Sequence, residues 1–312
     1  MVPLLFLVAK QVFTLFLLMA VGFFFTKRDI FTADTRSRMS TLLMYVVTPC
    51  VVIHSLTQTQ CTPELTHSVL LTLAATVVFY VVFALLSTPL FPSLVADTRD
   101  PMRFGTIYGN VGFMGLPLIQ GVLGTEAMIY CTVGVAVFNI ATWTHGLVLM
   151  GGKSNVSFKK ALLNPGVIGC IIGFLLFFTG LRLPTPLASA VNHLGNMNTP
   201  LAMLVIGGQM ASVQLLETFR RPLLYAVPSL KLLVLPLITA FLILPFGLNE
   251  AAYTTTVILA GCPTAGITGI FAQSFDRDAP ATAQLITLST LLSILTLPLV
   301  TLAAHAIYLW LC

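Results

Sequence analysis

The stretch that decides the fold is Gly109–Pro117, GNVGFMGLP, which interrupts a long apolar run. It holds three glycines and one proline in nine residues. Glycine lowers helix propensity and proline removes a backbone donor, so this composition predicts a break in a helix. Unwound backbone at membrane depth is tolerated only where protein or a water-filled cavity satisfies its polar groups. The stretch therefore predicts a functional break within a membrane helix.

The composition around this stretch is that of an integral membrane protein. Of 312 residues, 57% are hydrophobic and 8% are charged, whereas soluble chains carry roughly 25% charged residues. This scarcity of charge disfavours soluble enzymes, disordered proteins and nucleic-acid binders. Long continuous apolar runs in place of alternation exclude a membrane β-barrel. We expect an all-α integral membrane protein with the lipid bilayer as its partner.

Apolar runs bounded by charged or Pro/Gly/Asn-rich breaks predict ten membrane helices. The predicted spans are 2–26, 38–57, 66–92, 104–121, 125–150, 165–181, 197–216, 222–246, 251–272 and 281–311.

The basic residues predict the orientation of these spans. Twelve of the 15 Lys and Arg residues fall in loops on one side, namely Lys27, Arg28, Arg36, Arg38, Arg99, Arg103, Lys153, Lys159, Lys160, Arg220, Arg221 and Arg277. Positively charged loops stay in the cytoplasm, so both termini are expected outside the cell membrane.

Three short features recur at an almost constant offset of 151 or 152 residues. The pairs are Gly22-Phe23 with Gly173-Phe174, Thr48-Pro49 with Thr199-Pro200, and Asn110-Val111 with Cys262-Pro263. Coincidence of dipeptides is the alternative explanation. Taken as a repeat, they divide the chain into 1–150, a short cytoplasmic linker 151–164, and 165–312. Because each copy has five spans, which is an odd number, the second copy is inverted in the membrane. Inverted repeats are an architecture of secondary transporters.

The second copy has its own break, Gly261–Gly269, GCPTAGITG. Paired interruptions in corresponding spans point to a transport site. The free N–H groups at each half-helix start suit an anion, and the Asn110 amide can donate to a carboxylate. Close helix packing through small residues is the alternative for the glycines. The candidate substrate-binding residues are Gly109, Asn110, Val111, Asn139, Lys231, Cys262, Pro263 and Thr264, and the candidate hinge residues are Gly112, Gly115, Pro117, Gly261 and Gly266.

Other polar residues within the spans admit two interpretations each. Lys231 either balances a substrate carboxylate or changes protonation during transport, or it snorkels or pairs with helix-end carbonyls. Asn139 either faces the break or makes an interhelical hydrogen bond, and His145 is a candidate proton carrier. All Asp and Glu residues fall in loops or at span ends, which argues against a carboxylate-based ion site. No motif predicts a metal, a cofactor or a catalytic centre.

Residues 109–118, GNVGFMGLPL, resemble the helix-4 signature of the auxin efflux carrier family, including its bacterial malate/malonate-type members. Pro263, Phe271-Ala272 and Leu297-Pro298 resemble its helix 9–10 region, and residues 231–236, KLLVLP, its helix 8. Plant members have a proline where this chain has Gly109, and many carry a long cytoplasmic loop that is absent here. Both departures favour a bacterial organic-anion carrier.

The resemblance implies two inverted five-helix repeats whose helices 4 and 9 cross at the site, as in sodium/proton antiporter and bile-acid-symporter-like folds. It also implies that helices 1, 2, 6 and 7 form a scaffold, that helices 3–5 and 8–10 move, and that the chain forms a homodimer.

We therefore expect a secondary transporter, not an enzyme, that moves small organic anions by an elevator-type mechanism. Malate, malonate and auxin-like acids are the expected class of substrate. The alternatives are a sodium- or proton-coupled carrier of the bile-acid-symporter type and a non-transporting membrane sensor.

Overall fold

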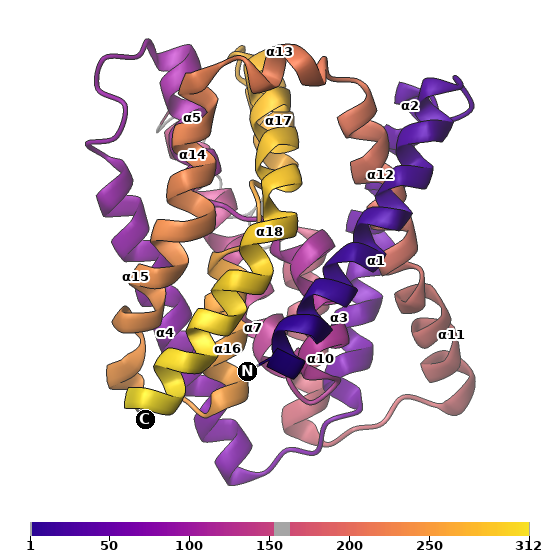
Figure 1. Cartoon of the computed structure of the whole chain (residues 1–312). Helices are drawn as coiled ribbons and strands as arrows, with labels where there is room; N and C mark the ends of the chain where they lie inside the picture. The colour runs from indigo at the N-terminus through magenta and orange to yellow at the C-terminus, as the bar shows by residue number, and fades with distance from the viewer. Residues whose placement is uncertain (1, 153–162, 312) are drawn as a thin grey trace.

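The computed structural model describes residues 2–152 and 163–311, and the regular secondary structure in these ranges is helical. Most helices run along one common direction, so the chain forms a bundle (Figure 1). The first helix begins and the last helix ends toward the same end of this bundle. Most of the predicted linker, with Lys153, Lys159 and Lys160, lies outside the described residues.

The helices of the first half are α1 (Val2–Lys27), α2 (Ala33–Leu42), η1 (Leu43–Val47), α3 (Thr48–Thr57), α4 (Pro63–Ser87), α5 (Ala96–Ile107), η2 (Val111–Gly115), α6 (Leu116–Leu123), α7 (Met128–Ala141), η3 (Thr142–Gly146) and α8 (Leu147–Gly151). Those of the second half are α10 (Pro165–Thr179), α11 (Thr185–Asn196), α12 (Asn198–Ala211), α13 (Leu215–Phe219), η5 (Pro222–Tyr225), α14 (Ala226–Ser229), η6 (Leu230–Val234), α15 (Leu235–Leu242), η7 (Leu244–Phe246), α16 (Glu250–Ala260), α17 (Ile267–Ser274) and α18 (Ala279–Leu311).

Local sequence signals begin several of these helices. The Thr62 hydroxyl accepts a hydrogen bond from the backbone N–H of Leu65 at the start of α4, and Pro63 follows at the first helical position. Asn164 caps α10 in the same way ahead of Pro165. Such caps satisfy N–H groups that a helix start leaves unpaired, and proline costs nothing there because its missing donor is not needed.

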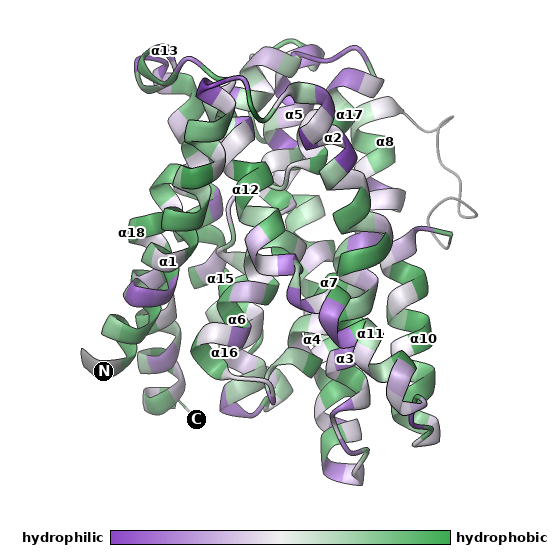
Figure 2. Cartoon of the chain, turned by 90° about the vertical axis from the view of Figure 1, so that its right-hand side faces the viewer, coloured by the Kyte–Doolittle hydropathy of each residue, from purple (hydrophilic) through white to green (hydrophobic). Residues whose placement is uncertain are grey.

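Six helical stretches are long and apolar enough to cross a membrane, judged by length and composition. They are Leu4–Lys27, Ala33–Thr57, Pro63–Ser87, Met128–Gly151, Pro222–Phe246 and Ala279–Leu311, with shorter apolar helices at Val111–Leu123 and Pro165–Thr179. Figure 2 shows hydrophobic residues along these helices and hydrophilic residues gathered at the end with α2, α5 and α13. The chain is thus an all-helical, multi-pass membrane protein. The count of ten spans and the inverted repeat stay predictions.

Two predicted spans are divided near the middle of a helix, and the span 197–216 is interrupted near its end, between α12 and α13. The span 104–121 is divided between α5 and η2–α6, and the span 251–272 between α16 and α17. Both of these breaks fall in a glycine-rich stretch singled out in the sequence. One further helix, α11, was not predicted, because its residues are too polar for a membrane span and its start at Thr185-Pro186 lies in a predicted loop.

The backbones of α1 and α12 lie in direct contact. A Cβ atom at Gly22 would overlap the backbone of Leu204, and one at Gly207 would overlap the carbonyl of Met19. Both neighbours are backbone atoms, which have no side-chain rotamer through which to move away. Small residues therefore allow the two helix backbones to touch, as in small-residue interfaces of membrane helices.

This contact predicts that Gly207→Ala destabilises the protein. The added methyl group must separate the backbones of α1 and α12, and overpacking of this kind costs about 1–3 kcal/mol. The melting temperature of the purified protein in detergent, followed by a thiol-reactive dye or by intrinsic fluorescence, should fall clearly. Gly112→Ala is the matched control, since no atom lies within 4 Å of its new Cβ. Equal melting temperatures for the two variants would contradict this account of the α1–α12 contact.

Candidate functional site

The two breaks cross each other and form a short antiparallel pair. The N–H of Asn110 donates to the carbonyl of Pro263 at 2.6 Å, and the N–H of Ala265 donates to the carbonyl of Tyr108 at 3.0 Å. Gly109 and Thr264 face each other between these bonds. The unwound segments thus satisfy their backbone groups through each other, as buried peptide groups require.

Side chains complete the hydrogen bonding of the crossing. The Thr264 hydroxyl donates to the carbonyl of Gly105 at 3.0 Å, and the Thr264 N–H donates to the Ser289 hydroxyl at 3.1 Å. A Cβ atom at Gly109 would lie 2.9 Å from the carbonyl oxygen of Cys262 and 3.0 Å from Cε of Lys231. Glycine at this position therefore permits the close approach of the two segments.

Asn110 begins the helix that follows the first break. Its Oδ1 accepts a hydrogen bond from the N–H of Phe113 at 3.2 Å, and its carbonyl accepts from Met114 and Gly115 at 3.1 Å each. The amide oxygen is thereby used as a helix cap. The side chain also lines a cavity, and in the described chain its amide nitrogen has no protein acceptor, which leaves a donor for a solute.

The cavity next to the crossing has a volume of about 130 Å³. Its walls come from both breaks with the adjoining η2 and α17, and from α2, η1, α3, α7, η3, α10, α12 and α18. None of the described residues that line it is charged. The polar lining residues are Ser40, Thr48, Asn110, Asn139, Asn164, Gln209 and Thr290, and the aromatic ones are Phe113, Phe138 and Trp143.

Unpaired backbone donors belong to this lining. In the described parts of the chain, no protein acceptor takes a hydrogen bond from the N–H groups of Gly112, Gly266 or Ile267, and all three residues line the cavity. They lie in the first turns after the two breaks. Free N–H groups of a helix start carry partial positive charge. The cavity is thus bordered by the positive ends of two helices and by neutral amides.

Lys231 occupies the other side of the crossing. It is fully buried, its Nζ donates to the carbonyl of Ile107 at 2.9 Å, and it is not among the residues that line the cavity. Ile107 is the last residue of α5, so the ammonium group lies at the negative end of that helix. This contact matches the helix-end pairing that the sequence allowed for Lys231. The carbonyl end of α5 is thereby compensated, while the N–H ends face the cavity.

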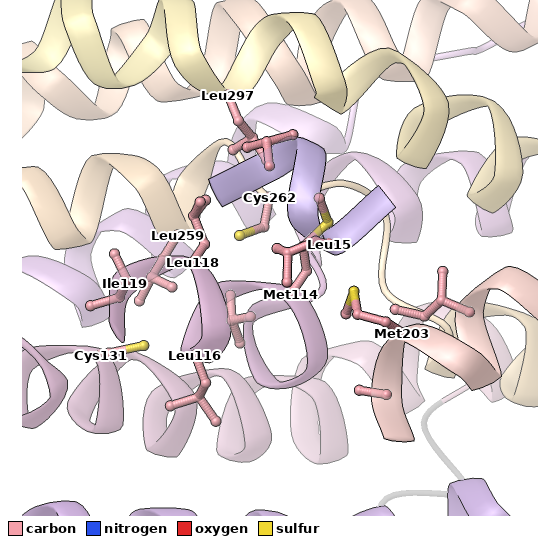
Figure 3. Packing of buried hydrophobic residues seen from close by; sticks show 14 of the residues in the cluster. Leu15, Met114, Leu116, Leu118, Ile119, Cys131, Met203, Leu259, Cys262 and Leu297 are labelled. Atoms are coloured by element: carbon pink, nitrogen blue, oxygen red, sulfur yellow. The ribbon is translucent and has the colours of Figure 1, made fainter. Parts of the chain in front are cut away.

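The remaining predicted residues build the crossing and do not line the cavity. Cys262 packs among Met114, Leu259 and Leu297 in a hydrophobic cluster (Figure 3), and Val111 belongs to the same cluster. The other residues of this group are Gly109, Gly115, Pro117, Gly261, Pro263 and Thr264. Asn110, Asn139, Gly112 and Gly266 are the predicted residues that do line it.

Asn139 reaches the cavity from α7. Its Nδ2 donates to the carbonyl of Val135 within the same helix at 2.9 Å. A Cβ at Gly166 would lie 2.8 Å from this Nδ2, so glycine lets the start of α10 approach the amide. The structure thus places Asn139 between the break and α10.

Sequence reasoning missed the cavity residues contributed by other helices. Gln209 is the clearest example, because it is an amide within the apolar run of helix α12. That signal is the same one that pointed to Asn110. Thr48 was noticed only as part of a repeat, and its hydroxyl donates to Oδ1 of Asn198 at 3.5 Å. No local pattern predicts that Ser40 or Asn164 faces the cavity, because both reach it only through helix packing.

Comparison with known proteins identifies related membrane transporters. The sequence matches the family Mem_trans, described as "Membrane transport protein", over residues 7–301. A "Putative malonate transporter" of Rhizobium meliloti is 25% identical over 272 residues, which cover 83% of each chain. An "Uncharacterized transporter" of Methanothermobacter thermautotrophicus is 27% identical over 194 residues, which cover 61% of this chain and 63% of that protein.

A further "Uncharacterized transporter", from Methanocaldococcus jannaschii, is 22% identical over 202 residues, or 61% of this chain and 65% of that protein. The chain thus matches less than two thirds of the length of either archaeal relative. The family match, in contrast, runs through both breaks and covers most of the chain, as the helix-4 signature predicted. This protein therefore belongs to Mem_trans, the auxin efflux carrier family of membrane transporters.

Proposed function

We propose that this protein is a secondary transporter that moves small organic anions, carboxylates such as malonate or malate, across the cell membrane. The observation that carries the proposal is the uncharged cavity at the crossing, where two helix starts and the Asn110 amide offer donors. Dipoles of this kind favour a negative group. They also avoid the larger desolvation penalty of a fixed buried cation.

The name of one relative supports the class of substrate. The Rhizobium meliloti relative bears the name "Putative malonate transporter". Malonate carries two carboxylates a short distance apart. We propose that one carboxylate is bound by the N–H groups at Gly266 and Ile267 and the other by the Asn110 amide and the Gly112 N–H.

We further propose that the crossing moves relative to a fixed part of the bundle in an elevator-type cycle. The glycine contacts between α1 and α12 support a fixed part, because helix backbones this close do not slide easily past each other. The cavity lies where α3, α10 and α12 meet the crossing, which is the boundary such a movement needs. A homodimer formed through the fixed part, with both chain termini outside the cell, belongs to the same proposal.

A sodium- or proton-coupled carrier of the bile-acid-symporter type is the alternative. It would lose transport when the ion gradient is removed. No Asp or Glu is among the described residues that line the cavity, which favours an uncoupled carrier or coupling through other groups. A non-transporting sensor is the second alternative, and it would bind the anion without uptake.

The proposal predicts that Asn110→Ala and Asn110→Asp both abolish most malonate uptake into proteoliposomes. Alanine loses the amide donor and the cap. A hydrogen bond to a charged group contributes about 1.5–3 kcal/mol, so uptake at low malonate should fall roughly ten-fold or more. Aspartate keeps an oxygen for the Phe113 N–H but repels the anion. The aspartate variant should therefore lose uptake while melting nearer to the wild type than the alanine variant.

The control for this experiment is Asn192→Ala, because Asn192 lies on α11 away from the cavity and accepts a hydrogen bond only from Asn196 in the described chain. It should transport malonate normally. Wild-type uptake by a folded Asn110→Asp variant would remove this residue from anion binding. Failure of the wild-type protein to move any mono- or dicarboxylate would refute the proposed substrate class.

Gly112 provides a test of the cavity itself. A Cβ at this glycine would meet no atom within 4 Å, so Gly112→Leu should fold normally and fill the space beside Asn110. We expect a melting temperature close to that of the wild type, with malonate uptake reduced at least ten-fold because the solute is excluded. Gly112→Ala should keep most of the uptake. Equal transport by the leucine variant and the wild type would place the solute elsewhere.

A further inference from the structure

A second cavity continues from the first toward the end of the bundle that carries α2 and α13. Its volume is about 240 Å³. The two cavities share Ile206, Gln209, Gly266, Ile270 and Ile286, so they are adjoining parts of one path. The exposed side chain of Gln273 lines the outer part. This second cavity is called the mouth below.

Arg36 is the single charged side chain among the described residues that line the cavity or its mouth. The sequence assigned it to the basic loops that set orientation. In the structure it lies in the first turns of α2, and its guanidinium faces α12. The other described residues that line the cavity and its mouth are uncharged, so no acidic side chain on this path offsets the positive charge of Arg36.

The Arg36 guanidinium has only neutral partners among the described residues. It donates to the carbonyl of Phe31 at 2.8 Å, to the hydroxyl of Ser212 at 2.8 Å and to the hydroxyl of Thr26 at 3.4 Å. Three other arginines, Arg38, Arg99 and Arg277, are paired with acids, Arg38 with Asp34 at 2.7 Å, for example. The charge of Arg36 is therefore not neutralised by the protein.

The position of Arg36 is also fixed. Its three bonds reach the end of α1, the turn before α2 and the residue that follows α12. Gly208 leaves room for its stem, since a Cβ there would lie 2.5 Å from Cδ of Arg36. Guanidinium has five N–H donors, and three bonds leave donors for an incoming anion. The group is preorganised at the mouth and does not swing freely in solvent.

We propose that Arg36 is a specificity-determining residue that draws anions into the mouth and so selects solutes by charge. A cleft that is lined by one sign of charge, with apolar walls, concentrates the field and raises the local concentration of the opposite ion. The bound anion then passes to the uncharged donors at the crossing. This inference rests on the proposed function for its substrate, and the electrostatic part of it can be tested without one.

The first test measures initial rates of malonate uptake by Arg36→Gln in proteoliposomes. Loss of the charge should raise the KM roughly ten-fold and leave the maximal rate nearly unchanged, because binding at the crossing is intact. Uptake by the wild type at low malonate should fall with added salt, and uptake by the variant should fall much less. Arg36→Lys should restore part of the lost affinity.

The matched control is Arg38→Gln. Arg38 lies two residues further along α2, is exposed, and is already paired with Asp34. This variant should leave the KM and its salt dependence unchanged. A merely structural Arg36 would lower the melting temperature and the maximal rate but would not change the salt dependence of KM. An unaltered KM in a folded Arg36→Gln protein would overturn the proposal.

The second test needs no substrate. A cysteine introduced by Gln273→Cys reports the potential at the mouth through its rates of reaction with anionic and cationic methanethiosulfonates. The anionic reagent should be favoured, and Arg36→Gln should lower the ratio of the two rates several-fold, whereas Arg38→Gln should not. The protein without Gln273→Cys gives the background from native cysteines.

The two tests separate the possible failures. If the wild type moves no carboxylate but the reagent ratio depends on Arg36, the proposed substrate class is wrong and the charge at the mouth stands. If malonate is transported but neither its KM nor the reagent ratio depends on Arg36, the proposed function stands and this inference is wrong.

Discussion

The constraint on which this structure depends is that peptide groups buried within a membrane protein must find hydrogen-bond partners inside the protein. Two helices in this chain are broken at mid-length, at residues 108–110 and 261–266. Each break exposes donors and acceptors that its own helix no longer satisfies. The solution is mutual, because Asn110 and Ala265 donate across the crossing to Pro263 and Tyr108. Each break therefore supplies hydrogen-bond partners for the other.

Other features follow from that pairing. Gly109 is needed so that the segments can approach, and Thr264 ties the second break to α5 and α18 through Gly105 and Ser289. The positive and negative helix ends around the crossing lie on different sides of it. A carbonyl end receives Lys231, and the N–H ends border the cavity. The described residues that line this cavity thus offer N–H donors and include no charged side chain.

The amino-acid sequence predicts much of this arrangement, since its strongest signals are local. Glycine and proline locate both breaks, and apolar runs locate the long helices. The sequence also identifies the residues of the crossing. It does not predict which of them line the cavity and which only hold the two breaks together. Whether Lys231 faces the solute or a helix end depends on how η6 packs against α5, and no local pattern encodes that packing. Gln209 and Arg36 reach the path for the same reason, through contacts between helices that are distant in sequence. The family match is consistent with the fold but does not assign these roles.

The burial of Lys231 against α5 has an electrical consequence. If the crossing moves as one body, the ammonium group moves with it, because its hydrogen bond is to Ile107 within that body. When the moving part holds a singly charged anion, the charges of Lys231 and the anion cancel. When it holds a doubly charged anion, the two together leave one negative charge. Empty, it carries one positive charge. An elementary charge that crosses the full membrane potential changes energy by about 2.3 kcal/mol per 100 mV. Voltage would then act on the empty carrier for a monoanion and on both steps of the cycle for a dianion, so that one lysine sets which step of the cycle responds to the membrane potential.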